Sequence, residues 1–176
     1  MRAYRAKDMA DSKADLLAGA GGLVTDEAQS DHQGRKALLL VRNNEDCDEF
    51  IALAKTMGIN IVDRVDQRGR SDAKWFLGQG KLQDVNEELR STSHGHPWND
   101  VDLLLLHTNA TPRQLVGVND AVGIEVWDRV RLLLALFTAH ASSVEARTQV
   151  RIARLQSDRT VLREVVKQQT TGERAG

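Results

Sequence analysis

The stretch VDLLLLH, residues 101–107, sets the fold class of this 176-residue chain. It is apolar almost throughout, whereas a strand with one face in water alternates apolar and polar residues. A run that is apolar on both faces is typical of the centre of a parallel sheet covered by helices on both sides. We therefore expect residues 101–107 to form such a central strand.

Three further stretches fit the same sheet: KALLLVR at 36–42, INIVDRV at 59–65 and IEVWD at 124–128. Helical spacing of apolar residues lies between them, at 45–57, at 82–89 and at 111–122, where Thr111 and Pro112 fit the cap and first position of a helix. Alternating strands and helices predict an α/β fold. We expect a four-stranded parallel sheet with helices on both faces, in the strand order 2-1-3-4 that right-handed crossovers favour.

The remainder of the chain has a different pattern. Residues 129–141 and 144–168 have helical periodicity, and the stretch TTGERAG after them is expected to be a loop. The long helix carries two apolar stripes, which predicts that it packs against two other structural elements. One stripe holds Ala146, Val150, Ala153 and Val161, and the other holds Val144, Leu155, Leu162 and Val166. We divide the chain into a mobile polar leader (1–34), an α/β subdomain (35–128) and a helical subdomain (129–176).

Charge is unevenly distributed along the chain. Residues 1–128 contain 15 Lys and Arg against 21 Asp and Glu, whereas residues 129–176 contain 9 against 4. An acidic body with a basic end indicates that the end meets a negatively charged partner. The chain has one cysteine, Cys47, which fits a reducing, cytoplasmic compartment, and no apolar run reaches the roughly 20 residues of a membrane span.

Basic side chains are concentrated on the long helix. Arg147, Arg151 and Arg154 form a ridge between the two apolar stripes, and other basic residues lie on another side. These side chains form either a solvated face or contacts with a polyanion, since arginine is well suited to phosphate. The candidate RNA-binding residues are Arg147, Arg151, Arg154, Arg159, Arg163, Lys167 and Arg174.

The stretch FLGQGKLQDV at 76–85 has the look of a phosphate-binding loop. It fails the Walker A pattern, because Trp75 stands at the position of the first glycine and Leu82 at that of the Ser or Thr. Gly78, Gly80 and Lys81 therefore form either a tight turn into a helix or a weak phosphate site. We predict no catalytic residue, and no metal site, since His94 and His96 have no third ligand near them in the sequence.

An ordered set of motifs from residue 36 to 176 resembles the N-terminal region of the HflX-type ribosome-associated GTPases, and the last of them is most similar to the archaeal branch. One difference is that Arg151 replaces an acidic residue of the family pattern. The motifs are ALLLV, VDRVDQR leading to FLGQGKLQDV, NATPRQLVGVNDAVGIEVWDR, EARTQVRIARLQ and TTGERAG.

The resemblance implies an α/β subdomain, then an antiparallel pair of long helices, then a GTP-binding domain. This chain would hold only the first helix of that truncated hairpin. Family members bind the large ribosomal subunit and help to dissociate ribosomes under stress. We therefore expect a module that binds ribosomal RNA and is not itself an enzyme. It would hold no cofactor, with GTP and magnesium belonging to the absent GTPase domain.

Two other functions remain open from the sequence. The first is a nucleotide-binding domain that uses residues 78–81. The second is a protein–protein scaffold that pairs through its long helix, including self-association of two copies through the C-terminal helix.

Overall fold

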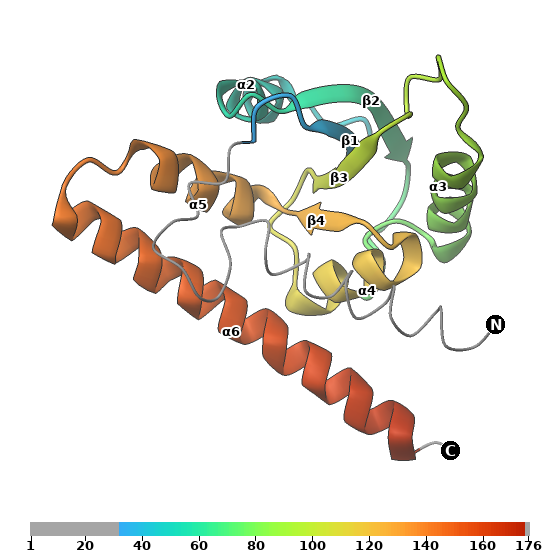
Figure 1. The fold of residues 1–176 in the computed structure, drawn as a ribbon. Coiled ribbons are helices and arrows are strands. Elements are labelled where there is room, and N and C mark those ends of the chain that lie inside the picture. Colours follow the sequence, from blue (N-terminus) through green and yellow to red (C-terminus); the bar gives the residue numbers. More distant parts are fainter. Residues whose placement is uncertain (1–31, 175–176) are drawn as a thin grey trace.

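The computed structural model describes residues 32–174, with side chains for residues 32–172, so the leader expected at 1–34 lies almost wholly outside the described residues. Its centre is a four-stranded sheet (Figure 1). The strand order is β2-β1-β3-β4 and every neighbouring pair is parallel, as predicted. The strands are β1 (Lys36–Arg42), β2 (Asn60–Gln67), β3 (Val101–Leu106) and β4 (Glu125–Trp127).

Helices cover both faces of the sheet, also as predicted (Figure 1). The helices α2 (Asp48–Thr56) and α5 (Arg129–His140) pack on one face. The helices α3 (Gln79–Ser91) and α4 (Pro112–Val122) pack on the other. The long helix α6 (Val144–Arg174) lies against α4 and α5, and its buried residues Val161 and Val165 belong to the core cluster of the α3 and α4 layer.

The positions of the two central strands, β1 and β3, explain why their sequences do not alternate between apolar and polar residues. In β1, Leu38 and Leu40 face the layer of α3 and α4, whereas Leu39 faces the layer of α2 and α5. In β3, Leu104 and Leu105 are divided between the same two layers. All five side chains are fully buried, because each face of the sheet is covered by helices.

Local sequence signals set the bounds of α4. The Thr111 hydroxyl accepts a hydrogen bond from the backbone N–H of Gln114, and the Gln114 side chain accepts one from the backbone N–H of Thr111. This capping box satisfies two N–H groups that the first helical turn leaves unpaired. The helix ends at Gly123, whose φ of 82° suits glycine.

The prediction of a loop at TTGERAG was wrong for residues 170–174, because α6 continues to Arg174, and the last two residues lie outside the described part of the chain. The hydroxyl of Thr170 donates to the carbonyl of Val166, and that of Thr171 to the carbonyl of Lys167. These hydroxyls bond to the preceding turn of the helix, so they do not draw the backbone out of the helical conformation.

Two glycines offer a matched test of the packing between α4 and the loop ahead of α3. A Cβ at Gly117 would meet the backbone carbonyl of Lys74 at 2.2 Å, whereas a Cβ at Gly80 would meet no atom within 4 Å. Gly117→Ala should lower the free energy of unfolding by about 1–3 kcal/mol, because overpacking displaces the loop. Gly80→Ala should raise it by up to about 1 kcal/mol, because alanine favours the helix.

Urea unfolding of both variants, followed by circular dichroism, measures these changes. Equal effects of the two substitutions would show that α4 and the loop are not in close contact.

Candidate functional site

The structure exposes most of the predicted basic side chains along α6. Arg147, Arg151, Arg159, Arg163 and Lys167 are exposed. Arg154 is different, because it is only half exposed and desolvation lowers the pKa of its guanidinium. The expected ridge of three arginines is therefore two exposed side chains and one that turns inward. Arg174 is the last residue of α6, and its side chain lies outside the described part of the chain.

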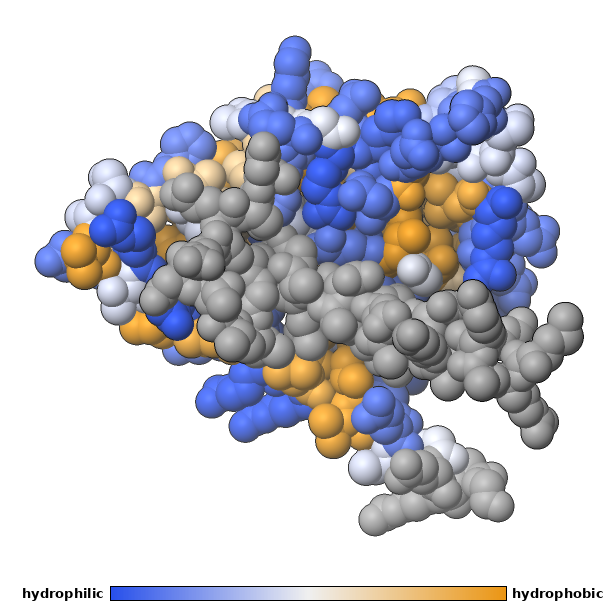
Figure 2. Space-filling model, viewed as in Figure 1, coloured by the Kyte–Doolittle hydropathy of each residue, from blue (hydrophilic) through white to orange (hydrophobic). Residues whose placement is uncertain are grey.

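An apolar stripe runs along the exposed side of the same helix. Val144, Leu155 and Val166 are 66%, 46% and 55% exposed, and Ile152 lies beside them at 50%. The opposite side is buried through Val161 and Val165. The two predicted stripes are therefore not cleanly separated, because Leu162 of the second stripe packs on the same core as Val161 of the first. Figure 2 shows hydrophobic side chains in orange beside hydrophilic ones in blue along this helix.

A buried ion pair fixes α6 to α5. The Arg131 guanidinium lies 2.6 Å from the Asp158 carboxylate, and their side chains are 1% and 4% exposed. Asp158 belongs to the buried stripe, because residues 158, 161 and 165 recur at helical spacing. An acidic residue on the apolar side of a helix was the signal that could have predicted this pair.

Asp128 joins the sheet to α5. One carboxylate oxygen accepts a hydrogen bond from the backbone N–H of Arg131, in the first turn of α5, and the other accepts from the N–H of Ala110, in the loop after β3. Burial raises the pKa of the Asp128 carboxyl, although these hydrogen bonds act in the opposite direction. The residue directly follows β4 and caps the next helix, so it sets the direction in which the helical arm leaves the sheet.

The loop ahead of α3 shows how Gly78, Gly80 and Lys81 are used. The N–H of Gly78 donates to the side chain of Gln67 at 2.6 Å, and Gly78 has an ordinary φ of −67°. Gly80 and Lys81 lie in the first helical turn, which has no side-chain cap. The loop is thus hydrogen-bonded to the end of β2 through the N–H of Gly78. Only the start of α3 and Lys81 could attract an anion.

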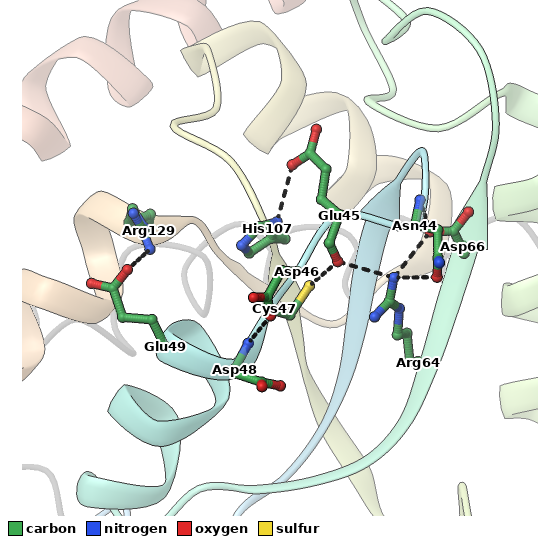
Figure 3. A network of polar contacts seen from close by, with 10 residues as sticks. All are labelled: Asn44, Glu45, Asp46, Cys47, Asp48, Glu49, Arg64, Asp66, His107 and Arg129. Carbon is green, nitrogen blue, oxygen red and sulfur yellow. Dashed lines mark hydrogen bonds and ion pairs between the residues drawn. The ribbon is translucent and has the colours of Figure 1, made fainter.

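Polar side chains meet at the carboxyl edge of the sheet, between β1 and β3 (Figure 3). His107 follows β3, and its Nδ1 lies 3.3 Å from a Glu45 carboxylate oxygen, without the alignment of a hydrogen bond. The imidazole also stands edge-on to Phe50. The sequence predicted a strand-end residue at 107 and missed Glu45, because the two loops meet only in the parallel sheet.

Other contacts brace the loop after β1. Arg64 donates to the side chain of Asn44 and to the carbonyl of Glu45, while Asn44 has a φ of 54° (Figure 3). Burial, and then the neighbouring carboxylates, raise the pKa of the Cys47 thiol, which Arg64 partly opposes. Such a thiol is a poor nucleophile. Across residues 32–174, no three His, Cys, Asp or Glu side chains are grouped so that they could hold a metal ion.

Comparison with known proteins identifies a protein family whose model matches this chain. A family model described as "GTP-binding GTPase N-terminal" matches residues 44–138. The chain is 31% identical over 119 residues to the GTPase HflX of Hyperthermus butylicus, a match that covers 68% of this chain and 30% of that protein. It is 28% identical to the GTPase HflX of Thermococcus kodakarensis, with 73% and 27% covered. The chain thus spans less than a third of the length of these relatives.

The fold is also found in solved structures. A GTP-binding protein from Sulfolobus solfataricus in complex with GDP matches with a TM-score of 0.59 at 23% identity, over 80% of this chain and 42% of that one. A G235S variant described as SsGBP matches with a TM-score of 0.61 at 25% identity, with 74% and 41% covered. In the part of this chain that the structure describes, no helix is long and apolar enough to cross a membrane.

The Arg131–Asp158 pair predicts a large loss of stability when one partner is removed. Asp158→Ala takes away the carboxylate that faces a buried guanidinium, so it should cost about 3–5 kcal/mol of unfolding free energy. Arg131→Met combined with Asp158→Leu should recover most of that loss, since neither member of the pair is then left buried without its partner. As a control, Glu164→Ala removes a half-buried carboxylate of α6 and should change stability by only about 0.5 kcal/mol. Chemical unfolding compares the variants, and a small cost for Asp158→Ala would contradict the assigned role.

Asp128 predicts a pH-dependent effect. A raised carboxyl pKa means that the folded state binds the proton more tightly than the unfolded chain, so folding gains stability as the pH falls through that pKa. Asp128→Asn cannot titrate and lacks one acceptor, so it should cost about 1–2 kcal/mol at neutral pH. The cost should grow as the pH falls from the raised folded-state pKa towards the ordinary carboxyl value of about 4, in urea unfolding of both proteins. A cost that shrinks over this range would show that the pKa is lowered instead.

Proposed function

Because the chain belongs to the GTP-binding GTPase N-terminal family and matches the N-terminal part of HflX GTPases, we propose that it is a module that binds ribosomal RNA on the large ribosomal subunit. In this proposal the module contributes to ribosome dissociation or rescue under stress in the cytoplasm. The observation that carries the proposal is the row of exposed cations along α6.

The acidic residues of α6 support this assignment by their placement. Asp158 is buried and its charge is matched by Arg131, and Glu164 is half buried. The exposed side of residues 144–167 therefore carries five cations against Glu145. Arginine binds phosphate oxygens with two parallel hydrogen bonds, and each cation that neutralises a phosphate also releases a counterion. Such a surface favours an RNA backbone over a protein surface of mixed charge.

Catalysis is not part of the proposed function of this chain. GTP and magnesium would bind the GTPase domain of a complete HflX protein, because residues 75–82 lack the Walker A pattern and Leu82, at the position of its Ser or Thr, is fully buried. The side chain at that position therefore has no hydroxyl for a magnesium ion and is turned into the core.

A second candidate function is weak nucleotide binding at the start of α3. It is favoured by the uncapped first turn of α3, where Lys81 is partly exposed and a Cβ at Gly80 would meet open space. The Gly78 N–H already donates to Gln67, so fewer donors remain for a phosphate than a Walker A loop supplies. Titration of the chain with ATP and with GTP distinguishes this function from RNA binding.

RNA binding predicts a specific salt dependence. Replacing Arg147, Arg151 and Arg163 together by glutamine should weaken binding to purified large ribosomal subunits, because three phosphate contacts are lost. The slope of log affinity against log salt should become shallower by about one unit for each lost contact. The matched control replaces three exposed arginines outside α6, at positions 68, 70 and 90, and should leave the slope unchanged.

Arg154 stays intact in both variants, since it is half buried beside Asp158 and its loss would alter folding. Equal affinities and slopes for the two triple variants would exclude α6 as the RNA-binding surface. A chain without salt-dependent RNA binding would instead favour the protein–protein scaffold.

A further inference from the structure

We propose that a cavity at the amino edge of the sheet binds a small organic cation, namely a protonated amine carried on an apolar body. The cavity lies where α3 and α4 end and β3 begins, and its volume is about 590 Å³. Pockets for small molecules generally measure about 300–1,000 Å³. Open α/β sheets usually bind ligands at the carboxyl edge, so this cavity lies at the opposite edge from the place that the fold favours.

One wall of the cavity is apolar and belongs to the core of the α3 and α4 layer. The side chains that form this wall are Leu89, Trp98, Val101, Val122 and Ile124. The indole N–H of Trp98 donates to the Asp63 carboxylate at 2.7 Å, which fixes the orientation of the ring. A wall of this kind can bury the apolar body of a ligand.

The charged residues of the cavity include two acids and one base. Asp100 and Asp120 line the cavity and are exposed. Among the described residues that line it, Arg90 is the one base, and its guanidinium donates to Asn86 of the same helix at 3.0 Å. Lys36 lies 3.8 Å from the Asp100 carboxylate and balances part of its charge. The argument therefore depends mainly on Asp120 and on the helix end that carries it.

The end of α4 adds negative charge to the same cavity. The last turn of a helix leaves carbonyl groups without a partner in that helix, and the end carries about half a unit of negative charge. The last turn of α4 contains Asp120 and no basic residue. An acidic residue is unfavourable there, because its charge has the same sign as the helix end. An acid that opposes its own helix and also lines a cavity indicates a ligand of positive charge.

These features together define the class of ligand. Carbonyl and carboxylate oxygens accept hydrogen bonds from an ammonium group, which has several N–H donors. A metal ion fits less well, because an apolar wall supplies no ligands and no three His, Cys, Asp or Glu side chains are grouped for a metal across residues 32–174. A fitting molecule places its ammonium group at the end of α4 and its apolar body against the wall.

The proposal does not rest on RNA binding, since the described residues that line the cavity include none of the α6 cations. Its test uses the full chain, isotope-labelled for NMR, and three indole probes of different charge: tryptamine, tryptophol and indole-3-propionate. Tryptamine, which carries an ammonium group, should cause saturable shifts of the amide signals at residues 98–101 and 119–124. Tryptophol, which is neutral, should bind several-fold more weakly, and the carboxylate of indole-3-propionate should bind most weakly of the three.

Three single variants test the assigned charges. Asp120→Asn should weaken tryptamine binding about threefold, as expected for an exposed ion pair, and should leave tryptophol binding unchanged. Arg90→Gln removes the opposing charge and should tighten tryptamine binding about twofold. Asp84→Asn removes an exposed carboxylate of α3 that does not line the cavity, and should leave the affinity for tryptamine unchanged.

Three outcomes would overturn the proposal. The first is the absence of saturable tryptamine shifts at residues 98–101 and 119–124. The second is tryptamine binding no tighter than tryptophol or indole-3-propionate, because the cavity would then not select a cation. The third is an equal loss of affinity in Asp120→Asn and Asp84→Asn, because the net charge of the protein would then attract the amine.

Discussion

The carboxylate of Asp128 is the interaction on which the arrangement of this protein depends. It lies where β4 ends, and its two oxygens bind backbone N–H groups from the loop after β3 and from the first turn of α5. The cost of burying this charge is large enough to raise its pKa, yet the position lets one side chain orient two segments. Because α5 leaves the sheet in a fixed direction, the Arg131–Asp158 pair can then set the position of α6.

The long helix shows how one element can serve both structure and recognition. Its inner side carries Val161, Val165 and the paired Asp158, so both the apolar surface and the charge on that side are satisfied. Its outer side carries apolar residues and arginines that the body of the protein does not cover. An exposed surface that combines apolar side chains with cations favours contact with another molecule, and this is why α6 carries the proposed function.

The edge of the sheet where many α/β proteins bind ligands is occupied differently here. At the point where the strand order reverses between β1 and β3, such folds place a crevice at the carboxyl ends of the strands. In this chain His107 packs there against Glu45 and Phe50, and Arg64 braces the loop after β1 (Figure 3). The protein's own side chains thus meet at that edge, and a row of exposed cations lies instead on α6.

The sequence alone determined the sheet and its helices. The apolar runs at 36–42 and 101–107 could be stable only with both faces covered, and this requirement, with the preferred handedness of crossovers, gave the parallel order β2-β1-β3-β4. Local signals such as the capping box at Thr111 set helix bounds, because their atoms lie within one turn of each other. The same periodicity predicted that Val161 is buried, but it placed Leu162 on a separate stripe although both side chains pack on the same core. The end of α6 was missed, since composition does not show that threonine hydroxyls bond to the preceding turn.

Only the tertiary structure decided which charged side chains are exposed and which are buried. Arg154 and Arg151 look alike in the sequence, yet one turns towards Asp158 and the other is exposed. Arg131 and Asp158 lie 27 residues apart, and Glu45 and His107 lie on different loops, so their proximity depends on how the helices and strands pack. The physical reason is that burial and charge pairing arise between elements distant in sequence, whereas periodicity reports only which side of one element is apolar.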